Sequence, residues 1–324
     1  MLLVKPFYGL LETDPTGGGF SLVTAPPNNF GKFYVSGNKI FGANWVSYGT
    51  SYIMQSTNKG STWSNASASF DGPSGFDFSV SASGSDFTYN GNGPDYWYSY
   101  SSGGGAWANS GSSTSLGYPV KTERDVSSII SLADNWGTLS LCTADNPVSV
   151  PSIILPISAM PYKMKAFPTI QRSLACTTSG LVFTNGYVMY TRTTANGLGS
   201  NTVYGGHMVS ASGPYLAATA SGLYRAVDAG GNTFTSIFAT KAFADVVETS
   251  GANPVIYAIA LGTVAGGGGL YVSKNAGASW KQYTIGLPSS IDSGARLIVS
   301  NYGGVVYIYV NSGGSLYRSH VSLP

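Results

Sequence analysis

The sequence has few charges. Only 9% of its 324 residues are charged, and the formal net charge at pH 7 is +2. No run of Lys or Arg provides the basic surface with which proteins neutralise nucleic-acid phosphates, so we expect no nucleic-acid partner. Disordered chains are charge-rich and poor in aromatic residues, whereas 13% of this chain is aromatic. The composition therefore favours a folded domain with a buried core.

Histidine and cysteine are scarce as well. His207 and His320 are the only histidines and lie far apart, which gives no support for a His-rich metal site or a Ser-His-Asp triad. We assign no metal and no cofactor. Cys142 and Cys176 are the only cysteines, and we expect free, buried thiols rather than a disulfide, because free cysteine prefers the interior.

Long apolar segments are absent too. The least polar stretch, residues 147–161, is interrupted by Pro151 and Pro156 and is too short to span a bilayer, so we expect no membrane insertion. Residues 1–9 have a lysine after three apolar residues and lack the apolar core of a signal peptide. A surface rich in Gly, Ser, Thr, Asn and Tyr is nevertheless typical of extracellular proteins. A virion protein released by lysis reconciles the two observations; a cytoplasmic protein, or one whose leader has been removed, also does.

Glycine is abundant, with 43 residues, and Ser, Thr, Tyr and Val are frequent. This composition favours short strands joined by tight turns, and hence an all-β fold. Two segments are clearly alike: residues 56–63 read STNKGSTW and residues 273–280 read SKNAGASW. Asn suits a tight turn through side-chain bonds to the backbone, Gly supplies a left-handed conformation, and Trp supplies a large apolar anchor. The shared positions are Ser56, Asn58, Gly60, Thr62 and Trp63, and Ser273, Asn275, Gly277, Ser279 and Trp280.

This shared pattern resembles the Asp-box, S-x-D-x-G-x-T-W, of the BNR-repeat, sialidase-like β-propellers. Asn replaces the usual Asp in both copies, which should keep the turn and lose only a charge. The resemblance implies a turn between the third and fourth strands of a blade, on the face opposite the catalytic site. The motif is therefore expected to mark the fold and not an activity.

Weaker copies of the unit fill the rest of the chain. Strand-like segments are centred at residues 54, 98, 141, 189, 224, 271 and 316. Seven such units in 324 residues average about 46 residues each, the length of a four-stranded blade. We predict one domain over residues 1–324, a single seven-bladed β-propeller of four-stranded blades. The last unit stops after its third strand, so residues 1–12, through the strand at 2–7, are predicted to supply the closing strand of the last blade.

Catalytic residues are poorly represented. A sialidase needs three arginines that bind the substrate carboxylate. The chain has six arginines, and two of them, Arg225 and Arg318, recur after Leu-Tyr and are interpreted as features of the repeat and not of a site. Other glycosidases need a pair of carboxylates, for which Asp95 and Asp134 are the candidates. Both also lie in segments typical of ordinary turns. The sequence therefore assigns no catalytic residue.

Binding without catalysis fits better. The turns predicted between second and third strands, at 48–50, 90–93, 185–186, 221–222 and 311–314, are short and polar. Nearby aromatic side chains can stack on sugar rings, although large aromatics also pack between blades. The candidate ligand-binding residues are Trp45, Tyr48, Asp95, Trp97, Asp134 and Trp136.

We therefore expect a non-enzymatic, virion-associated propeller, such as a bacteriophage tail or capsid appendage protein. Its partners would be a host-surface glycan, other virion proteins, or both. Two alternatives stay open: a cellular glycan-binding lectin, and a glycoside hydrolase or lyase with a carboxylate pair.

Overall fold

A computed structural model describes most of the chain. The described residues are 20–24, 33–36, 38–44, 49–71, 76–80, 84–85, 87–91, 97–101, 103–106, 108–112, 119–124, 129–134, 138–143, 153–154, 162–167, 172–185, 188–210, 212–228, 230–302 and 305–319.

These residues form antiparallel sheets, which we number in chain order. The first sheet contains β2 (Tyr34–Ser36), β3 (Lys39–Asn44), β4 (Thr50–Ser56) and β5 (Ser64–Asn65), with β6 (Phe70–Asp71) also paired to β4. The second contains β7 (Phe76–Val80), β8 (Phe87–Gly91), β9 (Trp97–Ser101) and β10 (Ala108–Ser112). The third contains β11 (Pro119–Arg124), β12 (Ile129–Asp134), β13 (Thr138–Thr143) and β14 (Ile153–Ile154). The fourth contains β15 (Lys163–Phe167), β16 (Arg172–Thr177), β17 (Gly180–Asn185) and β18 (Val188–Arg192).

The remaining sheets follow the same order. The fifth contains β19 (Val203–Met208), β20 (Tyr215–Thr219), β21 (Gly222–Ala226) and β22 (Thr235–Ala239), preceded by the short 3-10 helix η2 (Thr194–Asn196). The sixth contains β23 (Phe243–Glu248), β24 (Ile256–Ala260), β26 (Gly269–Ser273) and β27 (Lys281–Tyr283). The seventh contains β29 (Arg296–Tyr302), β30 (Val305–Ser312), β31 (Ser315–Ser319) and β1 (Phe20–Leu22). A separate pair joins β25 (Gly262–Thr263) to β28 (Ser290–Ile291).

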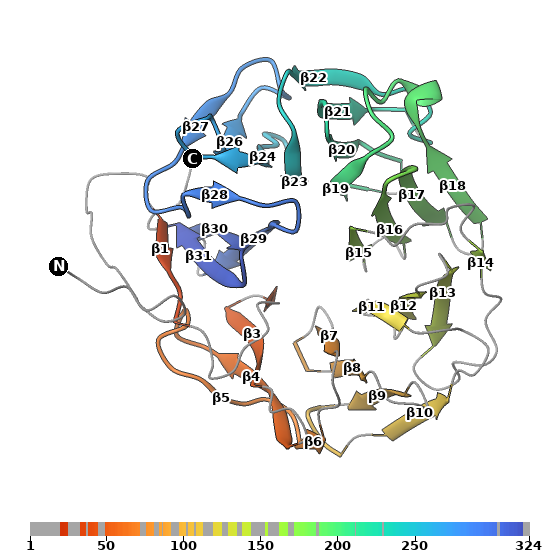
Figure 1. The fold of residues 1–324 in the computed structure, drawn as a ribbon, viewed down its shortest axis with the longest axis vertical. Coiled ribbons are helices and arrows are strands. Elements are labelled where there is room, and N and C mark those ends of the chain that lie inside the picture. Colours follow the sequence, from red (N-terminus) through yellow and green to blue (C-terminus); the bar gives the residue numbers. More distant parts are fainter. Residues whose placement is uncertain are drawn as a thin grey trace.

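The sheets stand around a common centre (Figure 1). The first strands β7, β11, β15, β19, β23 and β29 lie nearest that centre, and the fourth strands β10, β14, β18, β22 and β27 lie at the periphery. The prediction of an all-β fold built from four-stranded units is confirmed. Among the described residues, no helix has the length and apolar character needed to cross a membrane.

One strand assignment from the sequence is wrong. We placed the third strand of the fourth unit near residue 189, with the turn at 185–186 before it. The third strand is instead β17, which ends at Asn185, and the strand near residue 189 is the fourth, β18. Both strands contain a short run of apolar residues, 181–183 in β17 and 188–190 in β18, so the pattern alone could not separate them. With the centre of β17 at about 182, the steps to its neighbours at 141 and 224 become about 41 and 42, in place of 48 and 35.

The last sheet contains a strand from the beginning of the chain. β1 pairs antiparallel with β31, with Phe20 opposite Ser319 and Leu22 opposite Tyr317. The segment that the sequence predicted for this position, residues 1–12, lies outside the described residues. The edge of β31 is therefore covered by a segment about 15 residues further along the chain than the predicted strand at 2–7.

The core lies between neighbouring sheets. One cluster joins the sixth and seventh sheets and includes the buried side chains of Phe20, Tyr257, Leu270 and Ile308. Another joins the fourth and fifth sheets, where the rings of Phe183 and Tyr215 stack with their centroids 5.0 Å apart. Cys176 is a buried free thiol in this second cluster, as predicted, and the side chain of Cys142 lies outside the described residues. Face-to-face packing of sheets is thus the main source of apolar burial.

Candidate functional site

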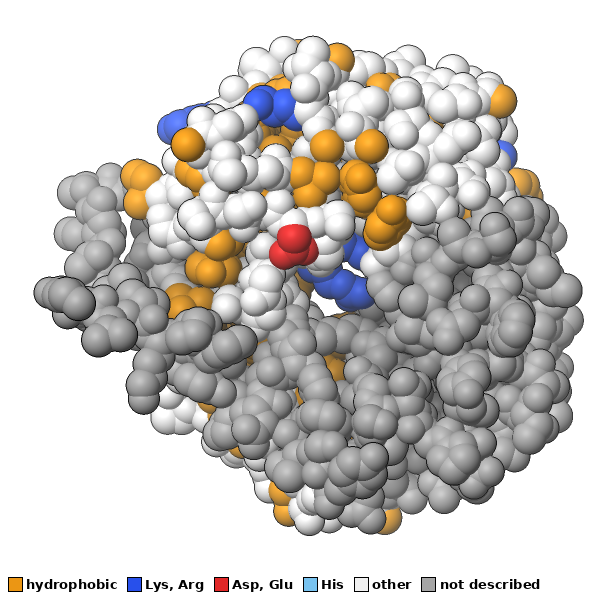
Figure 2. All heavy atoms as spheres, viewed as in Figure 1, with side chains coloured by type: hydrophobic (Ala, Val, Ile, Leu, Met, Phe, Trp, Pro, Cys, Tyr) orange, Lys and Arg blue, Asp and Glu red, His pale blue; other side chains and the backbone are white. Residues whose placement is uncertain are grey.

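Charged residues concentrate on the strands nearest the centre. The chain has 16 basic and 14 acidic residues, and nine of these charged residues lie on the first strands of the seven sheets. Figure 2 shows Lys and Arg side chains beside a central opening. The nine residues are Asp77, Lys121, Glu123, Arg124, Lys163, Lys165, Asp245, Glu248 and Arg296. Because buried or clustered ionisable groups are where functional sites are usually found, this region is the first candidate.

Asp245 lies at the middle of this central network. Its side chain is fully buried, and its Oδ1 accepts a hydrogen bond from Lys165 Nζ at 2.6 Å. The backbone amides of Val246 and Leu297 also donate to its carboxylate, each at 2.9 Å. Lys165 belongs to β15 and reaches Asp245 on β23, two sheets further along the chain. The strand between them carries Gly205, where a Cβ atom would lie 2.5 Å from Asp245 Oδ1, so only glycine leaves room for the carboxylate.

Lys163 extends the same network. Its side chain is buried, and Nζ donates hydrogen bonds to the backbone carbonyls of Ala244 and Ala295. Burial lowers the pKa of Lys163 to about 8, against the opposing effect of Asp245, which raises it. One lysine at the start of β15 thereby connects the fourth sheet to the sixth and the seventh.

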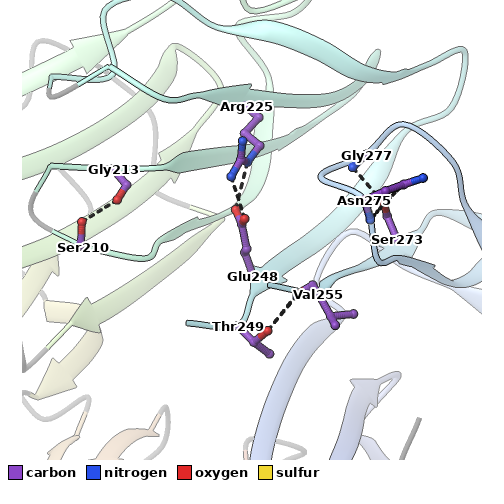
Figure 3. A network of polar contacts seen from close by, with 9 residues as sticks. All are labelled: Ser210, Gly213, Arg225, Glu248, Thr249, Val255, Ser273, Asn275 and Gly277. Atoms are coloured by element: carbon purple, nitrogen blue, oxygen red, sulfur yellow. Dashed lines mark hydrogen bonds and ion pairs between the residues drawn. The ribbon is translucent and has the colours of Figure 1, made fainter. Parts of the chain in front are cut away.

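A second ionic contact lies between the fifth and sixth sheets. Arg225 on β21 donates to both oxygens of Glu248 on β23, with Nε–Oε2 and Nη2–Oε1 distances of 3.1 and 2.8 Å (Figure 3). Arg318 has the equivalent place on β31, and its Nη1 donates to the carbonyl of Lys59 in the first sheet at 3.0 Å. The two arginines that we interpreted from the sequence as repeat features therefore each contact another sheet.

The chemistry of the network is that of a structural connection. Burial on its own would raise the pKa of Asp245, but the positive charges of Lys165 and Lys163 and the hydrogen bonds hold it below its usual range. The carboxylate is thus ionised, and its lone pairs are used by one lysine and two amides. Within the part of the chain that the structure describes, no three His, Cys, Asp or Glu side chains are grouped so that they could hold a metal ion.

His207 also belongs to this region, on β19. Part of its surface is accessible, but it lies deep among the inner strands. Burial is the main cause that lowers its pKa to about 3, and the nearby positive charge of Lys165 is the second. We predicted a turn or inter-blade residue here, whereas His207 is the penultimate residue of the inner strand β19 and lies opposite Leu216. It is neutral at pH 7.

The neutral state of His207 makes the fold sensitive to acid. Between pH 6.5 and about 3 the unfolded chain binds a proton at this position that the folded chain does not, so stability falls as the pH is lowered. We expect His207→Gln to reduce the loss of unfolding free energy between pH 7 and pH 4.5 by about 1–2 kcal/mol. Urea unfolding of both proteins at the two pH values measures this. The same pH dependence in both proteins would contradict it.

The two box segments form equivalent turns. Residues 56–63 join β4 to β5, and residues 273–280 join β26 to β27, in each case the third strand to the fourth. In the first turn Gly60 N donates to Ser56 Oγ at 2.8 Å, and Thr62 N donates to Asn58 Oδ1 at 2.9 Å. The second turn repeats both bonds at 2.9 Å: Gly277 N donates to Ser273 Oγ (Figure 3), and Ser279 N donates to Asn275 Oδ1.

Each box turn also contacts the outer strand of another sheet or the residues that directly follow it. Trp280 donates its indole N–H to the carbonyl of Ile237 on β22, and a Cβ atom at Gly277 would lie 2.7 Å from the same Ile237. Trp63 donates in the same way to Thr24, just after β1, at 2.7 Å. A Cβ atom at Gly60 would lie 2.0 Å from Val23, and both glycines have a positive φ, +91° and +95°. The segment at β1 therefore packs against the box turn of the first sheet in the same way as β22 packs against the box turn of the sixth sheet.

Solved structures of similar shape are numerous, although no family model and no curated protein matches the sequence. A structure of YCF48 bound to D1 peptide has a TM-score of 0.65 at 14% identity, over 94% of this chain and 96% of that one. A streptogramin B lyase structure has a TM-score of 0.64 at 11% identity, over 93% and 97%. The WD40 β-propeller domain of Doa1 has a TM-score of 0.56 at 11% identity, over 93% and 96%.

The chain is a β-propeller. At these identities the likeness shows the fold alone, because one fold supports many activities. The function of this propeller has to be argued from its own residues.

The predicted ligand-binding residues are only partly placed in the propeller. Trp45, Tyr48, Asp95 and Trp136 lie outside the described residues. Trp97 is the first residue of β9 and Asp134 is the last residue of β12. Both positions adjoin the connection between the second and third strands of their sheets. The structure does not describe their side chains. All six remain predictions.

Two of the described turns on this face of the propeller are stabilised by hydrogen bonds of their own threonine hydroxyl groups. Residues 177–180 and 219–222 share the pattern T-x-S-G, which the sequence reading missed, and each joins a second strand to a third. Thr219 Oγ1 donates to the carbonyl of Gly222 at 3.0 Å and accepts from the Ser221 amide at 3.1 Å. Residues 177–180 form the same two bonds, at 2.8 and 3.0 Å. These two turns are therefore short, polar and self-bonded, whereas in the turn between β30 and β31 Ser312 Oγ and Gly313 N donate to Asp292 Oδ2.

The central network was also missed. Lys163 and Lys165 alternate within a strand of a chain that has few charges, and Asp245 occupies a first strand two units later. The available signal was that these charges fall at the start of repeats and not in turns. Sequence alone could not show that the lysines reach the sixth sheet and not their nearest neighbour.

Proposed function

We propose that the seven sheets are the blades of one seven-bladed propeller of the Asp-box kind, and that the pairing of β1 with β31 closes the ring. The two box turns, with Asn in place of Asp, support the Asp-box assignment through their matching hydrogen bonds. The closure is supported by Trp63, whose indole N–H bonds to the segment following β1 as that of Trp280 bonds to β22.

We propose further that this propeller is a non-enzymatic binding and assembly module of a virion, such as a bacteriophage tail or capsid appendage. The observation that carries the proposal is the use of buried charge. The ion pairs of Asp245 and Glu248 with their cationic partners connect different sheets and so make a rigid scaffold. Binding would then fall to the polar face formed by the connections between second and third strands, with a host-surface glycan or other virion proteins as partners.

The similar structures are compatible with more than one use of the fold. YCF48 bound to D1 peptide is a propeller with a peptide partner, which supports docking of a protein. Streptogramin B lyase is named for an enzymatic activity on a similar shape. The two possibilities differ in a measurable way, because an enzyme changes its ligand and a binding module does not.

Binding and product release measured together test the proposal. The purified chain is applied to an array of bacterial-surface and animal glycans, and released sugar is determined in the same wells. We expect binding without release, and a loss of binding on Trp97→Ala or Trp136→Ala, because aromatic rings stack on the apolar faces of sugars. Val227→Ala, a change at a surface residue that is 72% exposed, is the control.

Release of sugar would overturn the non-enzymatic part of the proposal. Asp95→Asn and Asp134→Asn would then show whether the carboxylate pair carries the reaction. Absence of both binding and release would overturn glycan attachment and leave docking to virion proteins, which co-assembly with purified virion components would test.

A further inference from the structure

The two box turns share their hydrogen bonds but differ in the side chains around them. The polar bonds described above, and the indole bond to the preceding sheet, occur in both turns, so they account for the shared residues. Three further positions differ in chemistry. The second turn has Lys274, Lys281 and Tyr283 where the first has Thr57, Ser64 and Ala66. Since the turn forms equally well without them, the fold does not require these three side chains.

The three side chains line a groove. It has a volume of about 290 Å³ and lies over the turn and the strands β26 and β27. We call it the box groove. The exposed residues Lys274 and Lys281 border it, and the half-buried rings of Trp280 and Tyr283 form part of its wall. Its lining consists of Val272, Lys274, Asn275, Ser279, Trp280, Lys281 and Tyr283, with two cations and no acidic residue.

The charges of the box groove are not neutralised within the described part of the chain. No carboxylate there forms an ion pair with Lys274 or Lys281, and Lys281 Nζ lies 5.0 Å from the centroid of the Tyr283 ring. The lysine of the first turn is arranged differently. Lys59 Nζ donates to the hydroxyl of Tyr307 at 2.9 Å and lies 4.7 Å from the centroid of its ring, so it is held against the last sheet.

We propose that the box groove binds an anionic saccharide, with the two ammonium groups on its carboxylate and the sugar ring against Trp280 and Tyr283. Ammonium groups form charge-assisted hydrogen bonds with carboxylates, and aromatic rings pack against the apolar face of a sugar. This site is separate from the face of the second-to-third-strand connections and does not depend on the function proposed above.

The size of the groove and the groups exposed in it suit a saccharide. Its volume is close to the lower limit of the roughly 300–1,000 Å³ typical of ligand pockets, enough for one or two sugar rings. The amide of Asn275 and the hydroxyl of Ser279 bond to each other at 2.8 Å, and the Trp280 N–H bonds to Ile237. The lysines and the ring faces are therefore the groups left for a ligand, and they suit a charged ring.

Calorimetric titration of the full chain with matched sugars tests the proposal. The probes are trigalacturonate and sialyllactose, each compared with its neutral counterpart, galactotriose and lactose. We expect the acidic sugars to bind and the neutral ones not to, with an affinity that falls as salt is added because exposed charges are screened. The double substitution Lys274→Thr and Lys281→Ser, which installs the residues of the first turn, should weaken binding by about tenfold or more.

Three controls keep the result specific. Lys59→Ala removes the lysine of the first box turn and introduces the residue that the second box turn has at the equivalent position, Ala276. This variant should leave the affinity unchanged. The melting temperature of the double variant should match that of the wild type, since both lysines are exposed. Triglutamate should bind more weakly than trigalacturonate. Binding of neither acidic sugar, equal binding of the neutral sugars or of triglutamate, or unchanged affinity in the double variant would overturn the proposal.

Discussion

Replacing Asp245 with Ala lowers the free energy of unfolding by about 3–5 kcal/mol, the cost of leaving a buried ionic partner unpaired. The carboxylate is fully buried and neutralises Lys165 directly, and its charge also acts on the buried Lys163. Its removal leaves two cations without their counter-charge and the amides of Val246 and Leu297 without an acceptor. Urea unfolding followed by tryptophan fluorescence measures the change.

A double-mutant cycle separates the ion pair from the rest of the effect. Asp245→Asn keeps the shape and loses the charge, and Lys165→Met removes the partner. The double variant should be more stable than the sum of the two single losses predicts, because an apolar replacement of a whole buried pair costs little. An unfolding midpoint of Asp245→Asn equal to that of the wild type would show that the network does not hold the sheets together.

Deleting residues 1–24 strongly destabilises the protein, whereas deleting residues 1–12 leaves its stability close to that of the full chain. The longer deletion removes β1 and with it Phe20, which is buried in the cluster between the sixth and seventh sheets. Loss of a buried Phe alone costs about 3–5 kcal/mol. The longer deletion also removes Thr24, which accepts the hydrogen bond of the Trp63 indole. It exposes the edge of β31, and an exposed strand edge promotes aggregation.

The comparison of the two deletions identifies the closing strand. The sequence-based prediction assigns that role to residues 1–12 and expects the shorter deletion to be harmful. Thermal unfolding and light scattering of both proteins distinguish the two assignments. Phe20→Ala in the full chain serves as the control that keeps the chain length. Equal destabilisation by the two deletions would return the closing role to the earlier segment.

The repeat could be predicted because it is a local property. The box turns at 56–63 and 273–280 are made by residues within eight positions of one another, so their pattern is visible in the sequence and their hydrogen bonds match. One strand, near residue 189, was misplaced. The adjacent strands β17 and β18 have similar patterns, and no box marks the turn between them. Where the local signal was absent, spacing alone was not sufficient.

The candidate sites could be predicted less well. The sequence suggested aromatic and acidic residues near the connections between second and third strands, and these remain predictions. It treated the box as a marker of the fold and did not single out Lys274, Lys281 or Tyr283, because each is an ordinary residue in isolation. Only the equivalence of the two turns in space shows that the three side chains border one groove.

Composition and short-range pattern were enough to predict an all-β chain of four-stranded units with two box turns, and the resemblance to the Asp-box placed these turns between third and fourth strands. Those features depend on backbone preferences and on contacts between residues close in sequence. The tertiary structure alone decided that Lys163 and Lys165 reach Asp245, that β1 covers β31, and that Gly60 packs on Val23. These contacts join residues tens to hundreds of positions apart, and they exist only because the sheets are brought together around a common centre.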